Sequence, residues 1–209
     1  GVADGPRITN ILMKFESEYG KIPIYAFGAS SGGEFVASFL PQAMTNTKLV
    51  LSGYISQIMS TYPPESNVVP GVYITMDRDK MSQSNADKII ETVHQAKQIR
   101  NKHIRLSPLP LSNLFFYDRI NDPSLFTKDV SSEIVKALNE AGILDKDGFL
   151  KEDPRRSNWR TILRPVVPEA DSLVADRSAV SEVLNVAWAM HEMSRDGVED
   201  ALSLFAEQN

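Results

Sequence analysis

The chain has 209 residues, of which 42% are apolar and 23% charged, and its formal net charge is −5. This composition predicts one globular domain over residues 1–209, and the acidic balance without a basic run argues against nucleic acid as a partner. The charge-free stretches contain Gly, Pro and polar residues, so we expect no transmembrane segment, and without cysteine there are no disulfides or thiolate metal sites.

Apolar spacing predicts a helix and then a strand at the start of the chain. Apolar residues at i, i+3, i+4 and i+7 over residues 8–15 predict an amphipathic helix that stops at Gly20. The apolar run 22–27 predicts a strand buried on both faces rather than an alternating surface strand. Pro23 is expected at its first residue, where a missing N–H is tolerated.

The elements that follow predict an α/β fold. A helix over residues 35–40, with Pro41 beyond it, leaves a glycine-rich turn directly after the first strand. Further strands are predicted at residues 49–51, 72–76 and 104–106, and a further helix at residues 86–96. An irregular polar segment is expected between the second strand and Pro70. Strands that alternate with helices in this way predict a mostly parallel sheet flanked by helices.

The pattern changes in the second half of the chain. Residues 109–175 predict a mainly helical insertion, with a helix near residues 130–141. The segment 145–148 is expected to form a β-turn, because its acidic residues lack the spacing of a calcium loop. The aromatic run 114–117 fits either the core of the insertion or the wall of a substrate pocket. Two amphipathic helices then close the chain, at residues 180–188 and 198–205.

Residues 28–32, Gly-Ala-Ser-Ser-Gly, form a GxSxG motif between the first predicted strand and the helix after it. In such a nucleophile elbow, Ser30 takes a strained backbone conformation that lifts its hydroxyl above the sheet. Gly28, Gly32 and Gly33 are expected because strand and helix approach too closely for a Cβ atom. The amide of Ser31 then faces the same space and can stabilise an oxyanion. The alternative is a glycine-rich turn in which Ser30 only caps the helix.

A serine nucleophile needs a base, and the chain has three histidines. His94 falls within a predicted helix and His103 in a charged turn, and both come early in the chain. His191 comes last, just before the terminal helix, and is the predicted base. Because position 191 continues the apolar face of the helix at residues 180–188, the alternative is a histidine packed in the core.

The acid that orients the base is predicted in the Asp77-Arg78-Asp79 loop, directly after the strand at residues 72–76. Asp79 lies deep enough in this loop to reach a histidine and is preferred. Asp77 can instead cap the turn or pair with Arg78. For both carboxylates the alternative is ordinary solvated turn chemistry.

The GASSGG elbow, the Met-Asp-Arg-Asp loop and the late histidine resemble the α/β-hydrolase family, over roughly residues 7–106 and 176–209. The Ala-Met-His-Glu-Met segment is similar to a branch of that family found in plants and algae. The resemblance implies that Ser30 is the nucleophile, Asp79 the orienting acid and His191 the base. It further implies that the Ser31 amide is one oxyanion donor. No cofactor is expected, and because the sequence has no HxxxH, HExxH or carboxylate–histidine cluster, we expect no metal.

The resemblance covers the C-terminal part of the hydrolase fold. Only 29 residues precede Ser30, whereas the family carries further strands and a loop with a second oxyanion donor before its elbow. We therefore expect this chain to be part of a longer protein. The family's histidine sits in a glycine-containing loop, whereas residues 189–192 are predicted to be helical.

The sequence supports two functions. The leading hypothesis is a serine hydrolase that cleaves a small ester, thioester or amide through an acyl-enzyme. The alternative is a catalytically silent α/β-hydrolase-like module with a binding or structural role. In either case the insertion at residues 109–175 offers a surface for a protein partner.

Overall fold

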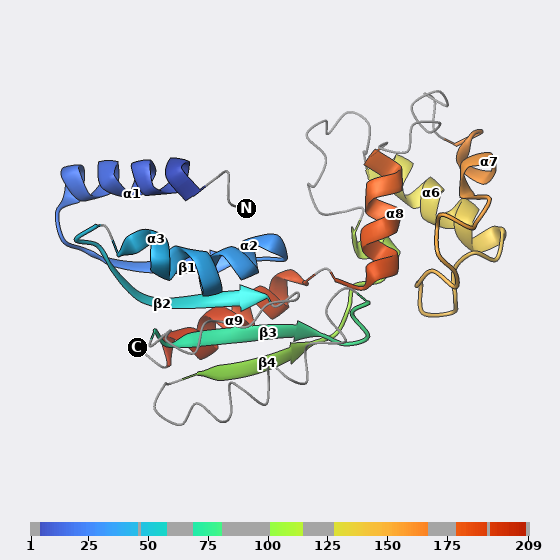
Figure 1. Ribbon diagram of the computed structural model, residues 1–209. Coiled ribbons are helices and arrows are strands. Elements are labelled where there is room, and N and C mark those ends of the chain that lie inside the picture. Colours follow the sequence, from blue (N-terminus) through green and yellow to red (C-terminus); the bar gives the residue numbers. More distant parts are fainter. Residues whose placement is uncertain are drawn as a thin grey trace. The chain divides into compact units, whose positions relative to one another are not determined.

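The computed structural model describes residues 5–45, 47–57, 69–80, 101–114, 128–166, 179–191 and 193–207. The chain forms two compact units (Figure 1). The sheet unit comprises Gly1–Leu106 and Arg195–Asn209, and the helical unit comprises Ser107–Ser194. The predicted insertion at residues 109–175 falls within the helical unit. None of the helices in the described ranges is long and apolar enough to cross a membrane.

The described part of the sheet unit is built on four parallel strands in the order β1-β2-β3-β4. Their bounds are β1 Pro23–Gly28, β2 Val50–Gln57, β3 Gly71–Met76 and β4 Lys102–Leu106. The predicted α/β class with a parallel sheet is therefore confirmed, and Pro23 is the first residue of its strand. The helix predicted at residues 86–96 lies outside the described ranges. Because the four strands run in one direction, their carboxyl ends lie at one edge of the sheet.

Helices cover both faces of this sheet (Figure 1). The helices of the unit are α1 Gly5–Tyr19, α2 Ser31–Glu34, α3 Leu40–Met44 and α9 Arg195–Ala206. Tyr54 on β2 packs into a core with Leu12 of α1 and Leu40 of α3, whereas the neighbouring Gly53 lies against Phe205 of α9. Since successive strand residues point to opposite faces, α1 and α3 lie on one face and α9 on the other.

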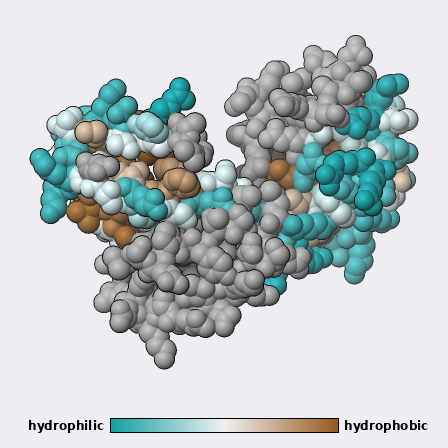
Figure 2. Space-filling model, in the orientation of Figure 1, coloured by the Kyte–Doolittle hydropathy of each residue, from teal (hydrophilic) through white to brown (hydrophobic). Residues whose placement is uncertain are grey.

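β1 differs from its prediction because it lies at an edge of the described sheet. Tyr25 is 54% exposed and Phe27 47% exposed. They lie on the α9 face of the sheet, where the Tyr25 ring meets the ring of Phe205 edge to face. Figure 2 shows apolar side chains at the surface in the part of the sheet unit that carries α1 and β1. The expectation of a strand buried on both faces is thus wrong. An apolar run alone does not distinguish a central strand from an edge strand that one layer of helices covers.

β2 is longer than predicted. The expected strand ended at Leu51 and was followed by an irregular polar segment, but β2 continues to Gln57. It does so because it pairs with β1 on one side and with β3 on the other. Its last five residues, Gly53–Gln57, are all buried. The polar Ser56 and Gln57 therefore lie within the fold rather than in a surface loop.

Pro41 lies inside a helical segment instead of beyond it. α2 continues into a π-helical turn at Phe35–Phe39 and then into α3, where Pro41 stands in the first turn. Proline has no N–H for the carbonyl of Ala37, and its ring crowds that carbonyl. The wider π-helical turn accommodates both effects, so the helical path does not end at Pro41 as predicted.

The helical unit has a core of its own. Its described helices are α5 Leu111–Leu114, α6 Lys128–Glu140, α7 Trp159–Leu163 and α8 Ala179–Ala189. Side chains of α6, α7 and α8 are almost fully buried in one cluster, among them Ile134, Leu138, Trp159, Leu163 and Leu184. The helix expected near residues 130–141 is confirmed, and so is the turn at residues 145–148. Apart from Leu114, the predicted aromatic run lies outside the described residues.

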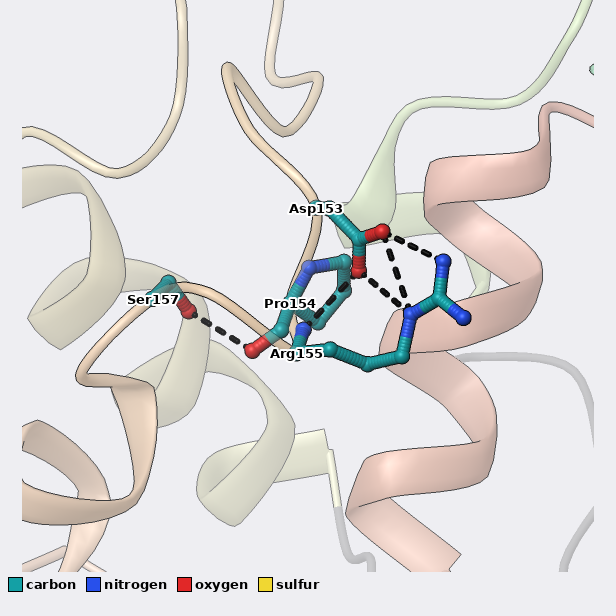
Figure 3. A network of polar contacts seen from close by, with 4 residues as sticks. All are labelled: Asp153, Pro154, Arg155 and Ser157. Carbon is teal, nitrogen blue, oxygen red and sulfur yellow. Dashed lines mark hydrogen bonds and ion pairs between the residues drawn. The ribbon is translucent and has the colours of Figure 1, made fainter.

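Asp153 fixes the turn that leads into α7 (Figure 3). Its carboxylate accepts the N–H of Arg155 at 2.9 Å and forms a two-pronged ion pair with the Arg155 guanidinium. Ser157 Oγ donates to the Pro154 carbonyl at 3.2 Å in the same turn. The hydrogen bonds from Arg155 lower the pKa of Asp153 to about 2. Because Arg155 is largely exposed, solvent screens the pair, which orders the turn more than it stabilises the unit.

Tyr54 and Tyr73 form a buried hydroxyl pair between β2 and β3. Both residues are 1% exposed, and their rings meet edge to face with 5.8 Å between centroids. Their hydroxyls hydrogen-bond to each other. Burial raises the pKa of both phenols, and that of Tyr73 reaches about 12. The pair therefore stays protonated in the folded chain at a pH where free tyrosine ionises.

We expect this pair to make the sheet unit sensitive to alkali. Unfolded tyrosine ionises near pH 10, so from there to about pH 12 the unfolded chain releases protons that the folded chain retains. The free energy of unfolding, measured by urea titration at fixed pH, should fall by about 1.4 kcal/mol per pH unit for each of the two tyrosines. In the double variant Tyr54→Phe/Tyr73→Phe the alkaline loss should be smaller. Equal slopes in the two proteins would contradict the raised pKa values.

Candidate active site

The GxSxG motif folds as a sharp turn from β1 into α2. β1 ends at Gly28, α2 begins at Ser31, and Ser30 between them has φ 55° and ψ −125°. L-residues rarely adopt this conformation, which costs on the order of 1–3 kcal/mol and persists only where the surrounding structure holds it. Ser30 makes no side-chain capping bond to α2, so the alternative of a capping serine does not hold. The strained conformation expected of an elbow serine is present.

Two of the three predicted glycines are required by close backbone contact. A Cβ atom at Gly28 would lie 2.1 Å from the Gly32 oxygen, and one at Gly33 would lie 2.0 Å from the Gln57 oxygen. Among the described residues, nothing lies within 4 Å of the Cβ position of Gly32. The expectation that a Cβ atom has no room is therefore wrong for Gly32 itself, although its carbonyl lies against Gly28. Strand, turn and helix meet at Gly28 and Gly33.

The end of β2 holds this turn through two side chains that the sequence did not single out. The Ser30 N–H donates to Gln57 Oε1 at 3.1 Å, and the Ser56 hydroxyl donates to the Gly33 carbonyl at 2.9 Å. Ser56 is 1% and Gln57 2% exposed. Sequence reasoning missed both because it ended the strand too early. The β-prone pair Tyr54-Ile55 was the signal that the strand continues.

The Ser31 amide is the predicted oxyanion donor. The N–H groups of Gly32 and Gly33 donate to the carbonyls of Ala29 and Ser30, both at 2.9 Å. Within the residues that the structure describes, the Ser31 N–H makes no such bond. It is therefore available to a group bound beside Ser30.

The loop after β3 separates its two aspartates. The Asp79 N–H donates to the Met76 carbonyl at 3.3 Å, and Arg78 within this turn has φ 58°. Asp77 is partly exposed and forms an ion pair with Arg105 of β4, not with Arg78 as one alternative had it. Asp79 is only 1% exposed. Asp79 is thus the carboxylate that the fold encloses, and the alternative of a solvated turn residue does not hold for it.

Ser30 and Asp79 lie at the same edge of the sheet. Ser30 follows β1 and Asp79 follows β3, and the parallel strand β2 runs between them. Two strand spacings, about 10 Å, separate the strands that carry them. One imidazole with a hydrogen bond at each ring nitrogen can bridge side chains that extend from the ends of such strands.

His191 belongs to the helical unit and lies in a non-helical segment. α8 ends at Ala189, Met190 has φ 54°, and His191 is buried and not helical. The predicted helix over residues 189–192 is therefore wrong at positions 190 and 191, because the left-handed Met190 turns the chain out of α8. Position 191 does not continue the apolar face of that helix. The histidine is described within its own unit, and the serine and aspartate within theirs.

The other two histidines differ from His191 in their setting. His103 lies near the amino end of β4, which begins at Lys102, so the prediction that it sits in a charged turn is wrong. Its Nε2 shares a hydrogen bond of 2.8 Å with Thr75 Oγ1 on β3. His94 lies outside the described residues. Across the described ranges no cluster of three or more His, Asp or Glu side chains could hold a metal ion.

Compared with known proteins, the chain matches no family model, no curated protein and no solved structure. The chemistry of the site is therefore interpreted from its own residues. These are a strained serine after β1, a donor amide beside it and an enclosed carboxylate after β3.

Proposed function

We propose that the chain is a serine hydrolase of the α/β-hydrolase type that acts on a small ester, thioester or amide. The observation that carries the proposal is the backbone of Ser30, with φ 55° and ψ −125°, in a turn where neither Gly28 nor Gly33 has room for a Cβ atom. Strained backbone conformations of this kind persist only where the surrounding structure holds them, and they concentrate at active sites. A serine presented in this way at the carboxyl edge of a parallel sheet is suited to nucleophilic attack.

In the proposed reaction His191 takes the proton from Ser30 Oγ while that oxygen attacks the carbonyl carbon of the substrate. The Ser31 N–H donates to the oxyanion that forms. The intermediate then collapses, His191 protonates the leaving group, and an acyl group remains on Ser30. Water, activated by His191, releases the acid and restores the serine. His191 is assigned from its place after Ser30 and Asp79 in the chain and from its non-helical segment.

Asp79 is proposed to orient His191. A buried carboxylate that accepts a hydrogen bond from one ring nitrogen leaves the other nitrogen as the acceptor that faces the serine. The same carboxylate stabilises the imidazolium that forms during attack. Asp77 cannot replace it, because its carboxylate already pairs with Arg105 at the exposed side of the loop.

The proposal is tested by covalent labelling with a fluorophosphonate probe, whose phosphorus is attacked by activated serine hydroxyls. We expect the chain to be labelled, Ser30→Ala to remain unlabelled, and Ser31→Ala to be labelled like the parent, because Ser31 contributes only its backbone amide. Circular dichroism would verify that all three proteins are folded. If the folded parent stays unlabelled while a known serine hydrolase labels in parallel, the catalytically silent binding module becomes the better account.

A further inference from the structure

Gln57 contacts the elbow at two points. Its side-chain oxygen accepts the Ser30 N–H at 3.1 Å, and its main-chain oxygen lies only 2.0 Å from the position that a Cβ atom of Gly33 would take. The residue is 2% exposed and ends β2, the strand next to β1. A backbone N–H can only donate, so the group that faces Ser30 is the carbonyl oxygen of the side-chain amide. Gln57 therefore fixes both the residue that carries the hydroxyl and the start of the helix behind it.

The hydrogen bond to Gln57 acts on the dihedral angle that positions the nucleophile. The N–H of Ser30 belongs to the peptide group between Ala29 and Ser30. Turning that peptide group changes φ at Ser30 and with it the direction of the Cα–Cβ bond. Because φ 55° is a costly value for serine, the peptide tends to turn unless an acceptor holds it. Gln57 supplies that acceptor at the end of a rigid strand.

We propose that Gln57 is a positioning residue for the nucleophile: its side-chain carbonyl holds the Ser30 amide and so aims the Ser30 hydroxyl. This inference rests on the proposed hydrolase function. A neutral acceptor suits the position, because a carboxylate there would bind the same N–H but place a negative charge close to the developing oxyanion. Catalytic groups must be held within a few tenths of an ångström, so loss of the acceptor should affect the rate more than the affinity.

The first test compares Gln57→Met, which keeps the length of the side chain but has no strong acceptor, with Ser56→Ala. Ser56 is a matched control, since it is equally buried at the same strand end and bonds the elbow at Gly33 rather than at Ser30. We expect Gln57→Met to lower the maximal rate of fluorophosphonate labelling by about 10–100-fold with little change in the probe's apparent affinity. Ser56→Ala should stay close to the parent rate. Equal losses in both variants would show a general loosening of the fold and would overturn the inference.

The second test uses Gln57→Glu, which restores an acceptor but adds an ionisable group. Its labelling rate relative to the parent should be high at a pH where the new carboxyl is neutral and should fall as the carboxyl ionises. Gln57→Met has no such group, so its relative rate should not change with pH in this way. If Gln57→Glu behaves like Gln57→Met at every pH, the acceptor has no positioning role.

Hydrogen exchange at the Ser30 amide separates this inference from the proposed function. We expect this amide to be protected in the parent chain and in Gln57→Glu, and to exchange faster in Gln57→Met. If protection follows this pattern but the parent chain is never labelled, the proposed hydrolase function fails and the positioning role falls with it. If the parent is labelled at Ser30 and Gln57→Met is labelled equally fast, the inference about Gln57 fails while the proposed function stands.

Discussion

Replacing Asp79 with asparagine is expected to lower the kcat for hydrolysis of a p-nitrophenyl ester by about 10⁴-fold, with a much smaller change in KM. Asparagine fills the same space, but its amide group can stabilise the wrong tautomer of the histidine, in which the nitrogen facing Ser30 carries a proton. Asp79 is 1% exposed, so water cannot take over the role of the carboxylate. The measurement is steady-state release of p-nitrophenol, corrected for the folded fraction of each protein.

Asp77→Asn is the matched control, because it makes the same chemical change two residues earlier in the same loop. Asp77 pairs with Arg105 at the exposed side of the loop. Loss of such an exposed ion pair changes stability by about 0–1 kcal/mol and should leave kcat near the parent value. A larger loss of kcat in Asp77→Asn than in Asp79→Asn would reassign the acid to Asp77.

The second large effect concerns the stability of the elbow, where only one of two neighbouring glycines should be destabilised by replacement with alanine. Gly33→Ala should lower the free energy of unfolding by about 3 kcal/mol or more, because its Cβ atom would lie 2.0 Å from the backbone oxygen of Gln57. Gly32→Ala should leave it unchanged or raise it by up to about 1 kcal/mol, because its Cβ position is open and alanine favours helix. Urea unfolding followed by circular dichroism measures both.

The outcome of this pair depends on the path of the backbone through the elbow. If Gly32→Ala destabilises the chain as much as Gly33→Ala does, the helix does not approach β2 in the described way. Because neither glycine contributes a side chain to the proposed reaction, the two variants test the packing of the elbow independently of its catalytic role.

Much of the fold could be predicted from the sequence, because it depends on local patterns. The apolar spacing of α1, the buried run of β3 and the stop at Gly20 are each set by nearby residues. The neighbours with which a strand pairs, in contrast, are set by residues far away in the sequence. β1 is an edge strand because, within the described sheet, it pairs with β2 alone. β2 reaches Gln57 because it has neighbours on both sides.

In the candidate site, too, features set by neighbouring residues could be predicted, whereas features set by contacts between distant residues could not. The strained turn at Ser30 could be predicted because GxSxG was flanked by a strand and a helix. The position of Asp79 in its loop favoured it over Asp77 as the acid, but its burial was not predicted. Gln57 could not, because its contact with Ser30 joins residues of two strands. The non-helical position of His191 depends on the left-handed conformation of Met190. This conformation could not be predicted from the sequence, because methionine rarely adopts it.

The measurement that tests the central claim most directly is a search for the acyl-enzyme. The chain is mixed with a p-nitrophenyl ester, quenched with acid within the first turnover, digested and analysed by mass spectrometry. The account predicts one acyl group on the peptide that contains Ser30, located on that serine by fragmentation and absent from Ser30→Ala. Acylation of Ser31 or of another residue, or ester cleavage that continues in Ser30→Ala at the parent rate, would contradict it.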